Sequence, residues 1–200
     1  MRTTLLIATI VLIAASAIAD DSPEIPFELP LLEGWRSETI PFPLDFAPEL
    51  EYEGFEELRF APGMFDEESD DFWTYAFVWW VALDTKISSE LITADLESYF
   101  RGLANAVAKS REFDPGDTAY EVTLQETPSP YGTETFFDAF VDTFDPFVTR
   151  DALSLHGRVE VVRCHKEEHT AVLFLFSPKS RSDSVWESLR EIRDGFRCSK

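Results

Sequence analysis

The sequence predicts an α+β fold in which a largely antiparallel sheet of about six to seven strands carries two main helices. Most of the strand-like segments are joined by turns too short for a parallel crossover, so neighbouring strands should run antiparallel. Two segments, residues 93–109 and 184–197, instead repeat apolar residues at the three- and four-residue spacing of an amphipathic helix. These observations place helices on a sheet within one chain.

Residues 1–19 have the pattern of a signal peptide. One positive charge, Arg2, precedes an almost wholly apolar run, residues 5–15, and an Ala-Ile-Ala sequence then supplies the small residues that signal peptidases recognise. The apolar run is shorter than the roughly 20 residues needed to span a bilayer, and no later stretch is longer. We expect cleavage between Ala19 and Asp20, no membrane span in the mature chain, and export to the periplasm or the medium. Retention as an N-terminal anchor is the alternative.

The mature chain is expected to begin with a proline-rich acidic lead-in, residues 20–48, packed on a single α+β domain, residues 49–200. Proline fixes φ and cannot donate a ladder hydrogen bond, so this lead-in should be extended, with a first short strand at residues 35–40. Its apolar side chains indicate that it lies on the domain. The prolines are Pro23, Pro26, Pro30, Pro41, Pro43 and Pro48.

The charge of the chain is acidic and unevenly distributed. The formal net charge is −21 at pH 7, and residues 20–71 hold 17 acidic residues against two basic ones, whereas residues 150–200 hold eight acidic and ten basic ones. Nucleic acids and anionic lipid surfaces attract clustered lysine and arginine, so the sequence argues against a nucleic-acid partner. We expect the acidity to serve solubility, and a basic protein or Ca²⁺ as partner is the alternative.

The first strands of the domain are expected at residues 55–63 and 72–83, on either side of a charged loop. The second of these strands is apolar on both faces, which indicates a central strand covered on both sides. One face takes the large side chains of Trp73, Tyr75, Phe77, Trp79, Val81 and Leu83. The other takes Phe72, Thr74, Ala76, Val78, Trp80 and Ala82. We expect the helices on the small-residue face, and the lead-in or other strands over the large rings.

Three rings of the large face raise a functional alternative. Trp73, Tyr75 and Trp79 share that face, as rings that stack on sugars or other ligands often do. If nothing covered them they would form an exposed apolar patch, which usually marks a binding site. Core aromatics are the commoner case, so the row is expected in the core, with a partly open aromatic groove as the alternative.

Residues 93–109 are predicted to form a helix, because Leu96, Phe100, Leu103 and Val107 recur at helical spacing. Thr93 is the expected N-cap. A strand at residues 119–124 follows. Residues 133–144 fit a helix through phenylalanines at four-residue spacing, and also a strand; the Thr and Phe content favours a strand. Further strands are expected at residues 152–164 and 170–178, joined by a tight turn.

The closing helix is the clearest element of the sequence. Its apolar stripe is Val185, Leu189, Ile192 and Phe196. Ser184 and Glu187 have the spacing of a capping box, and Gly195 is the expected C-cap. If this helix packs across the sheet, Cys198 just beyond it can meet Cys164 at the end of a strand. An exported chain with two cysteines is expected to oxidise them to a disulfide.

This order of elements, together with the closing helix "VWESLREIRDGFRC" (residues 185–198), resembles the PsbP/Mog1-like family of α/β sandwiches. The resemblance covers most of the mature chain. It implies an accessory or binding role without catalysis.

Two acidic or metal-ligating stretches are candidate cation sites. "CHKEEH" brings Cys164, His165 and His169 together with two glutamates, but its spacing matches no common zinc site, and a hairpin turn needs polar residues in any case. "DEESDD", residues 66–71, offers carboxylates for Ca²⁺ but lacks the glycine and the terminal glutamate of an EF-hand loop. We therefore expect no metal site, no cofactor and no catalytic residue.

Three classes of function stay open from the sequence. A non-enzymatic exported binding or accessory protein is favoured, because the motifs of the common hydrolases, zinc proteases, nucleotide-binding proteins and dithiol oxidoreductases do not occur. A hydrolase using a carboxylate pair or a metal is the first alternative, since 38 acidic residues leave a pair open. A structural component of the envelope is the second.

Overall fold

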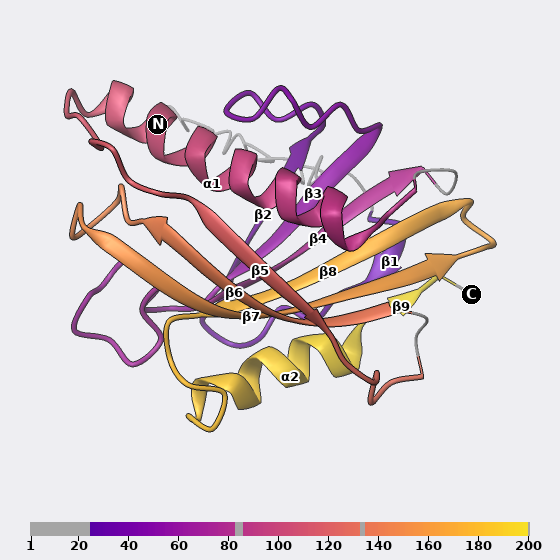
Figure 1. Ribbon diagram of the computed structural model, residues 1–200. Coiled ribbons are helices and arrows are strands. Elements are labelled where there is room, and N and C mark those ends of the chain that lie inside the picture. The colour runs from indigo at the N-terminus through magenta and orange to yellow at the C-terminus, as the bar shows by residue number, and fades with distance from the viewer. Residues whose placement is uncertain (1–24, 83–85, 133–134, 200) are drawn as a thin grey trace, which may run out of the picture.

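A computed structural model describes residues 25–82, 86–132 and 135–199. The expected signal peptide and its cleavage point lie outside these residues. The main sheet has seven strands in the order β2-β3-β4-β8-β7-β6-β5, with every neighbouring pair antiparallel (Figure 1). Its strands are β2 Arg36–Pro41, β3 Gly54–Phe60, β4 Tyr75–Ala82, β5 Glu121–Glu126, β6 Thr135–Phe144, β7 Ala152–Cys164 and β8 His169–Ser177. The predicted α+β class with a largely antiparallel sheet is confirmed.

Two helices lie on opposite sides of this sheet: α1, Ser89–Ser110, and α2, Val185–Gly195 (Figure 1). Each begins or ends within a few residues of its predicted bounds. Neither is at once long and apolar enough to cross a membrane, and the same holds for every helix in the described part of the chain.

Strand β4 is central, with β3 on one side and β8 on the other, as its two apolar faces predict. The structure confirms how the period of two sorts its side chains. Tyr75, Phe77 and Trp79 belong to one buried cluster, on the face covered by α1. Ala76 and Trp80 belong to a second buried cluster, on the face covered by α2.

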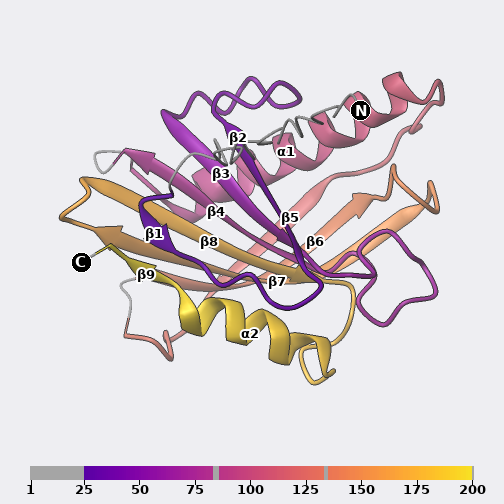
Figure 2. The same ribbon diagram turned by 180° about the vertical axis from the view of Figure 1, so that it is seen from behind.

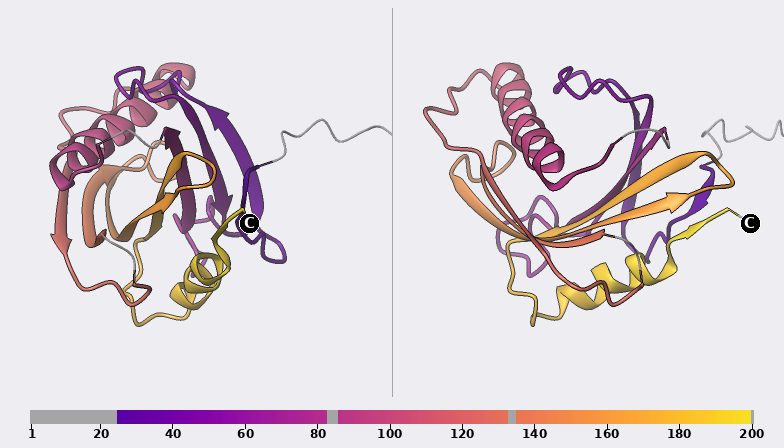
Figure 3. Two further views of the ribbon diagram at one scale, coloured as in Figure 1. Left: turned by 90° about the vertical axis from the view of Figure 1, so that its right-hand side faces the viewer. Right: turned by 45° about the vertical axis from the view of Figure 1, so that its right-hand side comes forward.

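The prediction that both helices cover the small-residue face is wrong, because α1 covers the large rings. Tyr99 of α1 stacks on Phe77, with ring centroids 5.6 Å apart and planes 7° apart. Phe100 meets Phe176 edge-on at 5.9 Å. A helix that carries rings of its own can fill the depth of a ring-lined face, and the sheet curves around it (Figure 3). Only α2, through Trp186 and its neighbours, lies on the small-residue face.

The helix caps differ from their predicted positions. Ser88, not Thr93, caps α1, accepting a hydrogen bond of 3.2 Å from the backbone N–H of Leu91; Thr93 lies inside the helix. The capping box of α2 does not form, because Ser184 is itself helical (φ −60°, ψ −29°) and its side chain makes no cap bond. Gly195 is the last residue of α2 rather than its C-cap, which is Phe196.

The lead-in packs against the end of α2. A Cβ on Gly195 would lie 2.1 Å from Pro30 Cγ, so this close approach explains the glycine. Strand β1, Phe27–Glu28, pairs antiparallel with β9, Arg197–Cys198, in a separate two-stranded sheet (Figure 2). The ring of Phe27 lies 4.9 Å from that of Trp80. The lead-in therefore covers part of the small-residue face beside α2.

Cys164 at the end of β7 and Cys198 in β9 form the expected disulfide, with a Cα–Cα distance of 5.6 Å. The bond closes a loop between residues 34 apart in sequence. A cross-link of this kind typically stabilises a fold by about 2–4 kcal/mol.

Residues 135–144, the described part of the ambiguous stretch 133–144, form β6 and not a helix. The strand is paired along its length with β7 and over part of it with β5, so ladder hydrogen bonds replace helical ones. Phe136 and Phe137 are buried on opposite faces, whereas Phe140 is 39% exposed. The strand interpretation is confirmed.

Candidate functional site

An apolar cavity of about 310 Å³ lies between α1 and the concave face of the sheet. Strands β2, β3 and β4 form one wall and α1 the other, and loops close the sides. Residues from the sheet wall are Glu38, Ile40, Leu58, Phe60 and Tyr75. Residues from α1 and the loops include Tyr99, Leu103, Phe46, Phe65, Trp73 and Phe147. Nearly every lining side chain is apolar or aromatic, as is usual for small-molecule sites.

Of the three residues predicted to form an aromatic groove, two line this cavity and one does not. Trp73 and Tyr75 line it, although their side chains are 1% and 3% exposed. Trp79 is 1% exposed and does not line the cavity. Its indole N–H instead donates a 3.1 Å hydrogen bond to Glu56. The structure thus joins two of the three residues at one cavity and places the third in the adjoining core.

Two polar atoms on the lining residues have no hydrogen-bond partner among the described residues: the indole Nε1 of Trp73 and the hydroxyl of Tyr75. Both are buried. An unsatisfied buried donor costs about 1–3 kcal/mol, so proteins rarely keep one without a reason. A molecule in the cavity that carries a hydrogen-bond acceptor could satisfy these donors.

Trp73 reaches the cavity through an unusual backbone. Its φ is +49°, in the left-handed region that non-glycine residues seldom adopt. The predicted strand from residue 72 therefore begins only at Tyr75. The turn still directs the indole of Trp73 into the large-ring core, where it meets Tyr75 edge-on at 6.0 Å. Strain of this kind costs about 1–3 kcal/mol and is concentrated at functional sites.

Glu56 of β3 lies beside the cavity with no exposed surface. Burial is the main cause that raises the pKa of Glu56 to about 8. Hydrogen bonds from Trp79 and Tyr99 favour the charged form and lower the pKa, whereas the nearby Glu38 raises it. At neutral pH the carboxyl is therefore mostly protonated. The two tyrosines near it, Tyr75 and Tyr99, have pKa values raised well above 10, chiefly by burial.

The mouth of the cavity is aromatic and partly open. Phe65 is 42% exposed and meets Phe147 edge-on, with ring centroids 5.3 Å apart. The guanidinium of Arg36 lies 5.4 Å above the ring of Phe65. Glu38 is exposed and adds a negative charge to the lining. A molecule entering the cavity would pass these rings.

Sequence reasoning missed most of this site. Phe65, Tyr99 and Phe147 come from a loop, a helix and a second loop that only the fold brings together. Glu56 could have been identified from the sequence, because in a strand it lies on the same face as the apolar residues Leu58 and Phe60. An acid at an inward-facing strand position is a candidate for a perturbed carboxyl.

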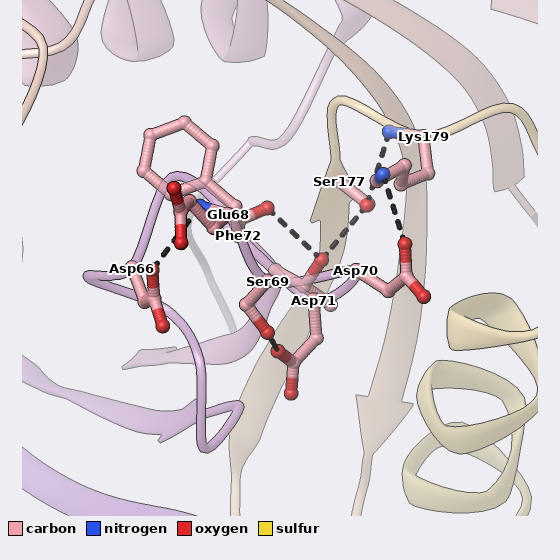
Figure 4. Close-up of polar contacts among 9 residues, drawn as sticks. Asp66, Glu68, Ser69, Asp70, Asp71, Phe72, Ser177 and Lys179 are labelled. Atoms are coloured by element: carbon pink, nitrogen blue, oxygen red, sulfur yellow. Dashed lines mark hydrogen bonds and ion pairs between the residues drawn. The ribbon is translucent and has the colours of Figure 1, made fainter.

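Three carboxylates of the acidic loop, residues 66–71, make polar contacts within the protein (Figure 4). Asp66 accepts a hydrogen bond of 3.1 Å from the backbone N–H of Glu68. Asp71 accepts one from the hydroxyl of Ser69. Asp70 forms an ion pair of 3.4 Å with Lys179, which follows β8. These carboxylates are not gathered into a group of three ligand atoms.

The second candidate cation site is also not assembled. Among the described residues the one group with metal-ligand spacing is Cys164, Glu167 and Cys198, and its two sulfur atoms are joined in the disulfide. His169 instead stacks on Trp80, with ring centroids 4.9 Å apart. The "CHKEEH" stretch therefore acts here as a hairpin turn between β7 and β8.

Comparison with known proteins gives a fold likeness alone. No family model matches the chain, and no curated protein matches it. One similar solved structure is LpqN, described as involved in cell envelope biogenesis of Mycobacterium tuberculosis; it is 11% identical, with a TM-score of 0.35, over 87% of this chain and 83% of that one. Another is the Ran-binding protein Mog1p of Saccharomyces cerevisiae, 13% identical, with a TM-score of 0.36, over 82% of this chain and 95% of that one. The element order of the sequence resembles the Mog1-like proteins, and Mog1p is one of these two structures, but both TM-scores are below 0.5, so neither likeness carries an argument.

Proposed function

We propose that this chain is a non-enzymatic binding protein whose cavity between α1 and the sheet holds an uncharged or cationic amphipathic molecule. The observation that carries the proposal is the pair of unpaired buried donors, Trp73 Nε1 and Tyr75 OH, on residues that line an apolar cavity. The rings would contact the apolar body of the ligand, and the two donors would bind an acceptor such as a carbonyl oxygen.

The charges that line the cavity disfavour an anionic ligand. Glu38 lines the cavity, and Glu56 lies beside it, buried and held largely neutral at pH 7. A carboxylate or phosphate entering here would be repelled by the first and would lose its hydration without gaining a cation in the lining. A neutral ketone, ester or alcohol, or an amine, meets no such penalty.

The exposed ring at the mouth gives the first test. Replacing Phe65 with alanine should weaken binding of the uncharged dye N-phenyl-1-naphthylamine roughly tenfold, because the ring contact is lost. Phe140→Ala is the matched control, since Phe140 is 39% exposed against 42% for Phe65 but lies on β6, away from the cavity. Dye fluorescence measures the affinity. Equal affinity of the two variants would count against this site.

The same assay tests the ligand chemistry. We expect 2-acetylnaphthalene to displace the dye better than 2-ethylnaphthalene, because only the ketone offers an acceptor to Trp73 and Tyr75. The anion 2-naphthoate should be the weakest of the three. If the ketone and the hydrocarbon compete equally, the two unpaired donors have no role in binding.

A hydrolase remains the second candidate, on one observation. Glu38 of β2 and Glu56 of β3 lie on the same face of the sheet, one diagonal step apart in the pairing register, and the first stays exposed while the second is largely protonated. Two neighbouring carboxyls in different environments, one exposed and one buried, can act as base and acid. Glu56 has no exposed surface, however, so binding is favoured. Aryl-glycoside hydrolysis that both Glu38→Gln and Glu56→Gln abolish would reverse this preference.

Export is part of the proposal. It rests on the signal-peptide pattern of residues 1–19 and on the disulfide between Cys164 and Cys198, a bond that forms in oxidising compartments. The mass of the protein recovered from the periplasm or medium of its host should correspond to a chain beginning at Asp20. A cell-associated protein that keeps residues 1–19 would contradict export by cleavage.

A further inference from the structure

A second cleft, of about 250 Å³, lies on the opposite side of the sheet, under α2. Its floor is apolar, formed by Leu173 and Leu175 of β8 with Trp186 of α2. The indole N–H of Trp186 already donates to the carbonyl oxygen of Lys179 at 2.9 Å, so this side chain offers its ring to the cleft rather than a donor.

Four arginines line this cleft, from β7, α2 and the segment between β8 and α2: Arg158, Arg181, Arg190 and Arg193. They stand in a protein with a formal net charge of −21. Like charges brought together repel one another, so such a cluster is unfavourable unless anions compensate it.

Two carboxylates compensate part of this charge. Glu160 is buried and forms a two-pronged ion pair with Arg193, which includes a 2.6 Å bond from Nη2. Asp138 is shared between Arg181, at 2.6 Å, and Arg158, at 3.5 Å. Two carboxylates thus pair with three of the four arginines.

Arg190 is the fourth arginine of the cleft, and neither of these carboxylates pairs with it. Its side chain is exposed, and it makes no hydrogen bond or ion pair with any residue that the structure describes. The other arginines are held by their carboxylates, and the ring of Tyr131 lies 3.9 Å from the guanidinium of Arg193. The site therefore combines fixed guanidinium groups, one unpaired guanidinium and an apolar floor.

We propose that this cleft binds an anionic group, a carboxylate or a phosphate monoester, carried on an apolar body. Guanidinium presents paired donors that match both anions, and Arg190 supplies the charge that the protein leaves unpaired. The apolar body would lie against Leu173, Leu175 and Trp186. This site is separate from the cavity under α1, whose acidic lining selects against anions, and it does not depend on the function proposed for that cavity.

Isothermal titration calorimetry with phenyl phosphate, benzoate, inorganic phosphate and the neutral benzyl alcohol tests the proposal. We expect phenyl phosphate or benzoate to bind more tightly than inorganic phosphate, and benzyl alcohol to bind least. Whichever aromatic anion binds more tightly identifies the anion. Raising the salt concentration should weaken binding of both anions.

The variant Arg190→Gln should bind the preferred aromatic anion about tenfold or more weakly, because one charge-assisted contact is lost. Arg101→Gln is the matched control, an exposed arginine on α1 at the other side of the sheet. Both replaced side chains are exposed, so both variants should fold, which urea unfolding checks. Benzyl alcohol binding as well as the anions, no anion binding below millimolar concentrations, or equal losses in the two variants would overturn the proposal.

Discussion

Replacing Arg59 with methionine is expected to lower the free energy of unfolding by about 3–5 kcal/mol, because it leaves a buried carboxylate without its partner. Arg59 is 4% exposed and forms an ion pair with Glu57, which is 3% exposed. The guanidinium also donates 3.0 Å hydrogen bonds to the carbonyl oxygens of Leu29 and Pro30. One side chain therefore neutralises a buried charge and fixes the lead-in to β3.

Urea unfolding at pH 7 measures this effect. Arg36→Met serves as control, since Arg36 lies on the neighbouring strand β2 but is exposed. The double variant Glu57→Leu/Arg59→Met should recover much of the loss, because replacing both members of a buried ion pair by apolar residues is often close to neutral. If Arg59→Met costs no more than Arg36→Met, the buried pair contributes nothing to stability.

The second large effect concerns the pH dependence of stability and comes from Glu56. Between pH 4.5 and about 8 the folded carboxyl keeps its proton while the unfolded one has lost it. The folded state then binds more protons, so the contribution of Glu56 to stability falls as pH rises through this window and is constant outside it. At about 1.4 kcal/mol per pH unit, the window corresponds to a loss on the order of 5 kcal/mol.

Glu56→Gln should remove this loss, because glutamine keeps an acceptor for Trp79 and has no proton to release. We expect the variant to be similar to the wild type at pH 4 and more stable by several kcal/mol at pH 9, measured by urea unfolding across the range. Glu38→Gln, at an exposed position on the same face, controls for the general loss of negative charge. A stability difference between Glu56→Gln and wild type that does not change with pH would show that Glu56 titrates normally.

Local sequence was sufficient for most strands of the main sheet and for the disulfide. The alternation of residues 72–83 placed Phe77 and Trp80 in the correct separate cores, because a strand's two faces follow from its backbone alone. Cys164 and Cys198 could be paired because they are the two cysteines of the chain and each lies at or just beyond the end of a well-marked element. In such cases the physical constraint acts within a few residues of the chain.

The features that the sequence did not predict depend mostly on contacts between distant segments of the chain. The large rings on β4 suggested that no helix would pack on that face. In the structure α1 covers it, because Tyr99 of α1 stacks on Phe77. The cavity was not predictable either, since Phe65 and Phe147 meet only when two loops 82 residues apart are folded together. The predictions of the helix caps were wrong for local reasons: α1 begins four residues before Thr93, and the helical backbone of Ser184 leaves its side chain without a cap bond.

The pairing of β1 with β9 has a consequence for the order in which the molecule folds. Phe27 is opposite Cys198, so this small sheet joins residues 171 positions apart in the chain. Closing so long a loop is entropically slow, and contacts of high sequence separation generally form after local ones. During synthesis, the segment around Phe27 emerges long before its partner strand exists. We therefore expect this segment to dock after the strands of the main sheet have paired.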